Sequence, residues 1–86
     1  MKHYYFDLRD GDALAPDEEG IDLPNIEAVQ EEAARSLVDM AKDAVRGRRF
    51  NGFGRGMEVE VRDEDGPVLQ AKFTFEINWK SNEALA

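Results

Sequence analysis

The chain has 86 residues, a net charge of −8 and no cysteine. These values leave room for one domain with a modest core, exclude disulfides and thiolate metal sites, and argue against non-specific attraction to nucleic acid or anionic membranes. No long apolar run is present, so we expect neither a signal peptide nor a membrane span and predict a cytoplasmic protein.

The first segment, residues 2–9, alternates between apolar and polar side chains. A period of two is typical of a strand with one buried face, and the apolar positions here are Tyr4, Phe6 and Leu8. The Asp-Gly pair at 10–11 predicts a turn, and residues 13–15 form a candidate return strand. We expect residues 17–24 to be an acidic connection that contains two apolar residues, Ile21 and Leu23.

Residues 26–46 have the spacing of an amphipathic helix, with apolar side chains on one stripe at Ile26, Val29, Ala33, Leu37, Met40, Ala41 and Ala44. Asn25 is the expected N-cap, and Gly47 is the expected C′ residue. Glu31 and Arg35 stand four residues apart in the order that favours an ion pair on the helix surface.

Residues 57–79 predict a β-hairpin, because alternation resumes on both sides of a turn around Gly66. A three-residue loop, 64–66, keeps apolar residues opposite apolar ones and places Glu58 opposite Lys72. The same loop pairs Asp63 with Pro67. The other expected pairs are Val61 with Leu69, Val59 with Ala71 and Met57 with Phe73. We expect Gly66 to adopt positive φ.

These elements predict a two-layer α+β domain over residues 1–80, with one long helix on one face of an antiparallel sheet of three to four strands. The tail, 81–86, is expected to fray, and the strand order stays open. The aromatic side chains of the apolar faces are expected in the core, namely Tyr4, Phe6, Phe73, Phe75 and Trp79. A buried Phe73 would make Phe73→Ala cost about 3–5 kcal/mol.

The last strand is longer than its hairpin partner, so residues 74–79 are expected to overhang it. An unpaired overhang is a site of association. The segment 3–9, a second copy of the chain or another protein could each pair with it.

Three blocks of the sequence are similar to a known family: residues 5–12 (Tyr-Phe-Asp-Leu-Arg-Asp-Gly-Asp), residues 17–24 (Asp-Glu-Glu-Gly-Ile-Asp-Leu-Pro) and residues 59–66 (Val-Glu-Val-Arg-Asp-Glu-Asp-Gly). They resemble a family of very small bacterial proteins described only as a domain of unknown function. The resemblance covers roughly residues 3–46 and 57–77. It implies an antiparallel sheet with one helix and a bacterial cytoplasmic origin, and it implies no activity.

A basic, glycine-rich loop follows the helix, and its arginine and phenylalanine side chains are candidates for nucleic-acid binding: Arg46, Arg48, Arg49, Phe50, Phe53 and Arg55. Guanidinium groups can pair with phosphates while phenyl rings stack on unpaired bases. The plainer interpretation is a solvated connection. We favour it, because outside residues 46–55 the chain carries 7 basic against 19 acidic residues and repels phosphate.

The acidic side chains between Asp7 and Asp22 do not have the spacing of an EF-hand loop, and ordinary turns explain them. His3, the single histidine, has no nearby nucleophile or second metal ligand in the sequence, so a surface role is expected. We therefore predict no enzymatic activity, no cofactor and no metal. The leading hypothesis is a protein-interaction or regulatory module that binds a protein partner, or itself, through its sheet edge or helix face. The alternative is a nucleic-acid-associated regulator using the loop 46–56.

Overall fold

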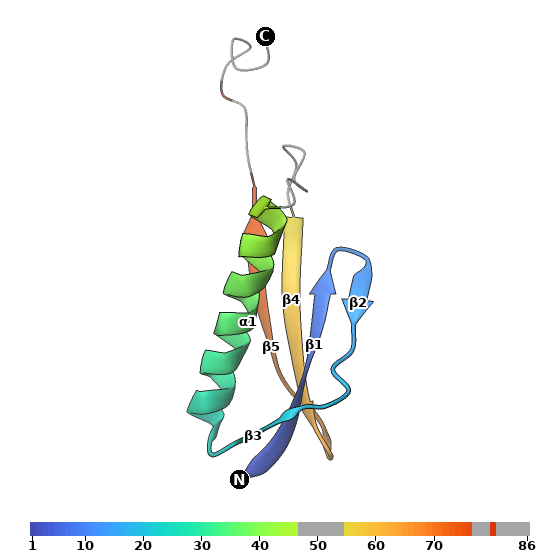
Figure 1. The fold of residues 1–86 in the computed structure, drawn as a ribbon, viewed down its shortest axis with the longest axis vertical. Helices are drawn as coiled ribbons and strands as arrows, with labels where there is room; N and C mark the ends of the chain where they lie inside the picture. Colours follow the sequence, from blue (N-terminus) through green and yellow to red (C-terminus); the bar gives the residue numbers. More distant parts are fainter. Residues whose placement is uncertain (47–54, 77–79, 81–86) are drawn as a thin grey trace.

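One helix packs against one face of an antiparallel sheet in the computed structural model, which describes residues 1–46, 55–76 and 80 (Figure 1). The elements are β1 (Lys2–Asp10), β2 (Ala13–Ala15), β3 (Ile21–Leu23), α1 (Ile26–Arg46), β4 (Arg55–Asp63) and β5 (Gly66–Phe75). The predicted α+β architecture is confirmed. The predicted number of strands is wrong, since the sheet formed by these residues has five rather than three to four.

The sheet has the order β2-β1-β4-β5, and β3 pairs with β1 beside β2. The strand that the sequence did not predict is β3, which contains the apolar residues Ile21 and Leu23. Its register places Tyr4 opposite Ile21 and Lys2 opposite Leu23. Three residues are too few to show a period in the sequence, so their pairing with β1 decides their conformation. The predicted return strand at Ala13–Ala15 is confirmed.

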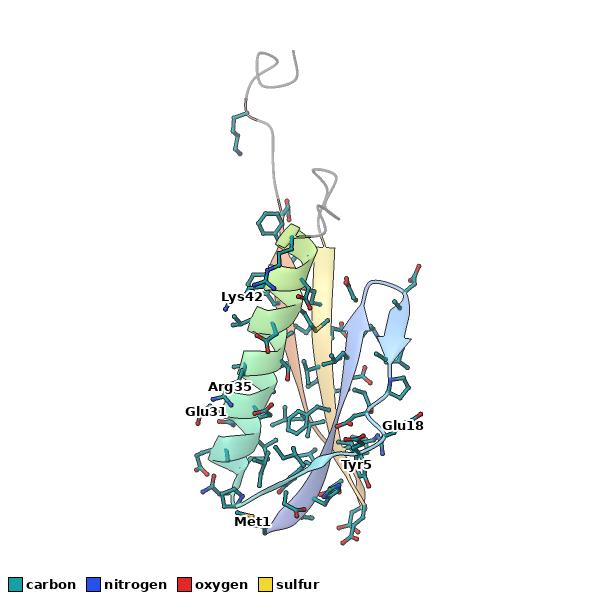
Figure 2. All side chains as sticks on the ribbon, in the orientation of Figure 1. Met1, Tyr5, Glu18, Glu31, Arg35 and Lys42 are labelled. Atoms are coloured by element: carbon teal, nitrogen blue, oxygen red, sulfur yellow. The ribbon has the colours of Figure 1, made fainter. Side chains whose placement is uncertain are left out.

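The helix has the predicted bounds and the predicted N-cap. The Asn25 side-chain oxygen accepts from the Ala28 N–H at 2.9 Å, which satisfies one of the free donors of the first turn. Arg35 reaches both Glu31, at 3.3 Å, and Glu32, at 3.1 Å. Glu31 and Arg35 lie on the face of α1 turned away from the sheet (Figure 2). The predicted C′ residue, Gly47, lies outside the described residues.

The hairpin has the predicted register over most of its length, with Val61 opposite Leu69, Met57 opposite Phe73 and Glu58 opposite Lys72. The predicted pairing at the turn is wrong. Asp63 pairs with Gly66, which leaves a two-residue loop, and the register shifts between Val61 and Arg62, so Val68 is an extra residue that forms a bulge in β5. Gly66 does adopt positive φ, at 123°. The Asp65 N–H donates to the Asp63 side chain at 2.8 Å, which favours the tighter turn.

The predicted overhang is also wrong over its first two residues. Strand β4 begins at Arg55 rather than at Met57, so Thr74 pairs with Gly56 and Phe75 with Arg55. Strand β1 pairs with the opposite side of β4 and does not reach β5. Residues 77–79 lie outside the described residues.

The core lies between α1 and the middle strands, and its largest fully buried side chains are Met57, Val29, Val59 and Val61. Tyr4 and Phe6 are buried as predicted, each 8% exposed. The predicted burial of Phe73 is wrong: the residue lies on the expected face of the sheet but is 42% exposed. It stands on the outermost strand, where α1 covers the sheet only in part, so the predicted loss of 3–5 kcal/mol is too large.

No helix in the described part of the chain combines the length and the apolar character needed to cross a membrane.

Candidate functional site

Strand β5 ends the sheet, and no strand among residues 1–46 and 55–76 pairs with its outer side. The Gly11 N–H donates to the Gly56 carbonyl at 3.2 Å, so the Gly56 backbone faces β1. The N–H and C=O groups of successive strand residues face opposite sides. Those of the next residues in β4 therefore alternate between β5 and β1. It follows that Leu69, Ala71 and Phe73 face β4 and that the backbone groups facing outward belong to Gln70, Lys72 and Thr74.

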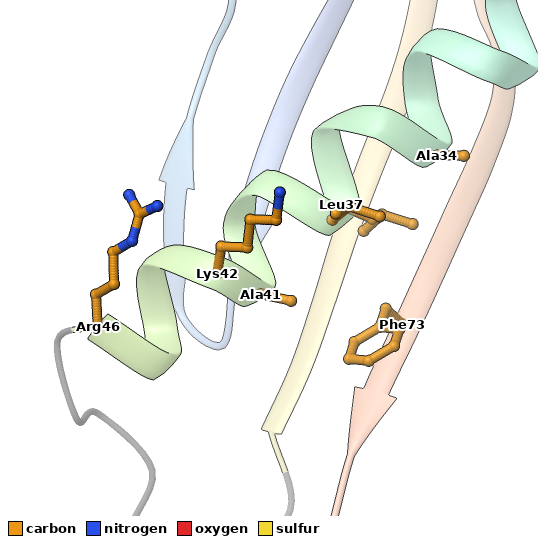
Figure 3. Close-up of a pocket in the computed structure, with 7 residues that line it drawn as sticks. Ala34, Leu37, Ala41, Lys42, Arg46 and Phe73 are labelled. Atoms are coloured by element: carbon orange, nitrogen blue, oxygen red, sulfur yellow. The ribbon is translucent and has the colours of Figure 1, made fainter.

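An apolar groove of about 630 Å³ lies beside this edge, between α1 and β5. It is lined by Ala34, Leu37, Val38, Ala41, Lys42, Arg46 and Phe73 (Figure 3). The core stripe of α1 faces β4, so the next stripe of the helix projects over the rim of β5. The two large apolar side chains left most open there are Val38, 52% exposed, and Phe73.

The charged side chains that line this groove are positive, although the whole chain carries −8. They are Lys42 and Arg46, both near the carboxyl end of α1, where cations are favourable. Glu27 lies in the first turn of the same helix. Glu27 therefore lies near one end of the helix, and the groove-lining Lys42 and Arg46 lie near the other.

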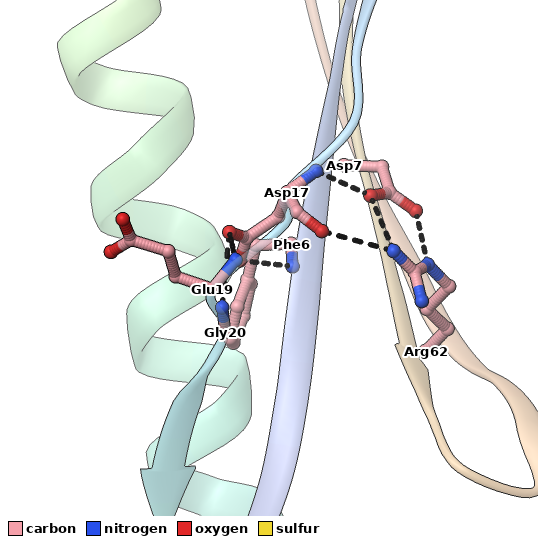
Figure 4. A network of polar contacts seen from close by, with 6 residues as sticks. All are labelled: Phe6, Asp7, Asp17, Glu19, Gly20 and Arg62. Atoms are coloured by element: carbon pink, nitrogen blue, oxygen red, sulfur yellow. Dashed lines mark hydrogen bonds and ion pairs between the residues drawn. The ribbon is translucent and has the colours of Figure 1, made fainter.

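At the other edge of the sheet, a polar cluster holds the connection 16–20 against β1 and β4 (Figure 4). The Asp17 carboxylate accepts from the backbone N–H groups of Phe6 at 3.1 Å, Glu19 at 3.2 Å and Gly20 at 3.1 Å. Arg62 donates to the Asp7 carboxylate at 2.9 Å and to the Asp17 carbonyl at 3.0 Å. The Asp17 N–H donates to Asp7 at 2.8 Å.

The charges in this cluster support one another. Partial burial alone would raise the pKa of Asp17, but the three backbone N–H donors and the nearby Arg62 outweigh it, and the pKa is held below its usual 3.8. The hydrogen bond to Asp7 raises the pKa of Arg62. The Arg62 guanidinium also lies 4.4 Å from the centre of the Tyr5 ring, a cation–π geometry. This cluster is satisfied internally, so we interpret it as structural.

His3, near the start of β1, contacts both β3 and the connection before it at the same edge of the sheet. Its Nδ1 lies 2.7 Å from the Asp22 carboxylate and its Nε2 lies 2.7 Å from the Glu19 carbonyl. Both oxygens are acceptors, so the doubly protonated imidazolium satisfies both contacts. The hydrogen bond to Asp22, followed by that to Glu19, raises the pKa of His3 above its usual 6.5. The surface role expected for this histidine is thus a clamp between β1 and β3.

Two of the six candidate nucleic-acid residues lie in the described part of the chain. Arg46 lines the apolar groove. Arg55 is the first residue of β4, and Arg48, Arg49, Phe50 and Phe53 lie outside the described residues. Nothing in the described part of the chain adds support to this alternative.

Sequence reasoning missed both the cluster around Asp17 and the groove. The signal for the cluster was present: Asp7, Asp17, Gly20 and Arg62 all fall within the three blocks that carry the family resemblance. In the described part of the chain, no group of three or more acidic, histidine or cysteine side chains is arranged to hold a metal ion.

The fold and this surface define a small two-layer α+β protein in which the short strands β2 and β3 close one edge of the sheet, while no strand among the described residues pairs with the outer side of β5. The sequence matches the family described as "Domain of unknown function (DUF6894)" over residues 3–74, and the chain belongs to that family. The resemblance to a small domain-of-unknown-function family is confirmed. No curated protein and no solved structure matches the chain.

Proposed function

We propose that this protein is a non-enzymatic interaction module that binds a protein partner by strand addition to the outer edge of β5. The single observation that supports this most is that β5, whose outer side pairs with no strand among the described residues, has an apolar groove beside it. In strand addition, backbone hydrogen bonds provide affinity and pockets for alternate side chains provide specificity. The edge of β5 offers the backbone hydrogen bonds, and the groove around Phe73 and Val38 offers a pocket for side chains.

The composition of β5 also supports this function. Of its ten residues, Lys72 alone is charged, and its ammonium lies 3.6 Å from Glu58. Proteins usually protect exposed edges with charges, bulges or short strands. The bulge near Pro67 affects the first residues of β5, and the rest of the strand stays regular. We also propose that the protein acts as a regulator in the bacterial cytoplasm.

Proline substitution at the edge tests the proposal. Gln70→Pro removes an outward N–H, so it should block strand addition while keeping the ladder to β4. Gln70→Ala, which keeps the backbone donor, is the matched control. Ala71→Pro removes an inward N–H and should unfold the hairpin, which verifies the orientation.

The readout is affinity capture of the tagged protein from its native host lysate, with and without nuclease. We expect a protein recovered by wild type and Gln70→Ala but lost with Gln70→Pro. A partner that Gln70→Pro retains at full yield would contradict strand addition. A partner lost on nuclease treatment would favour the alternative that uses the loop 46–56.

A further inference from the structure

We infer that the occupant of this edge and groove is a second copy of the chain, with β5 pairing antiparallel to the partner's β5 about a two-fold axis at Ala71. This inference rests on the proposed function and names its partner. Two-fold contacts are self-complementary, because one patch on both copies must serve as both halves of the interface. The edge, the groove and the charges of α1 each satisfy that condition.

The spacing of the elements favours a second copy over an extended peptide. Helix α1 packs on both β4 and β5, so its axis lies about half a strand spacing, or roughly 2.4 Å, inside β5. Adding the partner's β5 at about 4.8 Å then places the two α1 axes about 10 Å apart. Packed helices lie about 8–10 Å apart. An extended peptide would cover the edge but leave the helix side of the groove open.

The side chains between the two helices suit such packing. Ala34 and Ala41 are small, and Val38 projects between them on the same stripe of α1. Helix α1 and strand β5 run in the same direction (Figure 1). Antiparallel pairing of the strands therefore makes the two helices antiparallel and lays each exposed Val38 against the other copy's helix. Phe73 is covered in the same step.

Charge on β5 selects the register. An axis at Lys72 would set that lysine opposite its own copy, a destabilising like-charge pair. An axis at Phe73 would pair only the last part of the strand. An axis at Ala71 sets Lys72 opposite the partner's Gln70 and Phe73 opposite the partner's Leu69. Both Gln70 and Lys72 have outward backbone groups, so each such pair exchanges two N–H···O bonds.

The charges of α1 fit the same axis. Phe73 lies beside Leu37 and Ala41, and Ala71 lies about 7 Å back along the strand, equal to four or five helix residues. The axis therefore crosses α1 near Ala34. Lys42 stands eight residues after Ala34 and Glu27 seven residues before it. Antiparallel helices bring Lys42 next to the partner's Glu27, an opposite-charge pair that occurs twice by symmetry.

Sedimentation velocity of the purified 86-residue chain over a range of concentrations tests the oligomeric state. We expect a concentration-dependent dimer that Gln70→Pro abolishes and Gln70→Ala keeps. A chain that stays monomeric at every concentration overturns the inference. If the monomer still captures another protein in a manner sensitive to Gln70→Pro, the proposed function survives and only its partner is wrong.

Single cysteines test the register, since the chain has no cysteine of its own. Ala71→Cys should oxidise to a cross-linked dimer, because directly opposite positions on paired strands come within disulfide reach. Ala13→Cys, on the short strand at the other side of the sheet, is the matched control. Cross-linking of Ala13→Cys as fast as Ala71→Cys would contradict this interface.

Charge reversal tests the helix pairing independently of the strand. Lys42→Glu alone and Glu27→Lys alone should each weaken dimerisation about five- to tenfold. The double variant should recover to within about threefold of wild type, because the pair is restored across the interface. Far-ultraviolet circular dichroism verifies folding of each variant. Additive losses in the double variant would overturn the antiparallel helix contact.

Discussion

The sheet has one edge beyond β1 and another beyond β5, and the chain covers the two differently. Beyond β1, the short strands β2 and β3 share the edge, and the connection between them is tied down by Asp17, Arg62 and His3. At the other edge, β5 is a regular strand with one charged residue. The edge beyond β1 is held by side chains from three separate segments, whereas no strand among the described residues pairs with the outer side of β5.

The largest expected effect contrasts two neighbours on the same face of the β4–β5 pair. Met57, opposite Phe73, is 1% exposed, whereas Phe73 is 42% exposed. Met57→Ala should cost about 2–5 kcal/mol of unfolding free energy, and Phe73→Ala only about 1–2 kcal/mol. Urea unfolding at low protein concentration measures both. Equal losses would show that Phe73 is as well packed as the core.

Two glycines on the closed side differ in what a methyl group would meet. Gly11 and Gly20 have φ of 61° and 70°, but only at Gly20 would a Cβ fall close to other atoms, 2.5 Å from His3 Nε2 and 2.7 Å from the Tyr4 carbonyl oxygen. Gly11→Ala should cost about 1 kcal/mol for backbone strain. Gly20→Ala should cost about 1–3 kcal/mol more, because the backbone oxygen cannot move freely. Thermal or urea unfolding of the two variants checks the difference, and similar costs would show that this edge is loosely packed.

Asp17 should stabilise the closed edge in a pH-dependent way. Its pKa in the folded protein lies below the usual 3.8. Its contribution is therefore complete above that value and is lost as the pH falls through the folded-state pKa. Asp17→Ala should cost about 1–2 kcal/mol at neutral pH, with a smaller difference from wild type in acid. Urea unfolding at several pH values measures this, with Asp12→Ala in the exposed turn as a control that should change little. A cost that is independent of pH would assign the effect to packing.

The smallest expected effect belongs to His3. Its pKa is raised above 6.5 by Asp22 and Glu19. Its contribution to the β1–β3 contact is therefore present below 6.5 and is lost as the pH rises through the folded-state value. An NMR titration of the His3 ring should give a midpoint above 6.5 in wild type and a lower one in Asp22→Asn. The same midpoint in both proteins would mean that the clamp is not formed in solution.

Local patterns in the sequence predict those parts of the fold that depend on neighbours in the chain. The helix bounds follow from Asn25 and the apolar stripe, and the hairpin register follows from the charges and alternation around Gly66. The sequence could not predict β3 or the contact of Asp7 with Arg62, because these depend on pairing between distant segments. The exposure of Phe73 was missed for the same reason: alternation shows which face a residue occupies but not how far a helix covers that face.

The ion pair between Asp7 and Arg62 joins residues 55 positions apart, and it has a consequence for the order of folding. The β4–β5 hairpin and the helix close only short loops, whereas β1 reaches β4 across the whole helix and the connection after it, at a larger cost in chain entropy. We therefore expect β1 and the Asp17 cluster to join last. Asp7→Asn should then speed unfolding and leave the refolding rate nearly unchanged in stopped-flow experiments, and a slower refolding rate would place the pair in the folding nucleus. Until β1 joins, the side of β4 that faces away from β5 is unpaired, so the partly folded chain has its greatest tendency to aggregate at that stage.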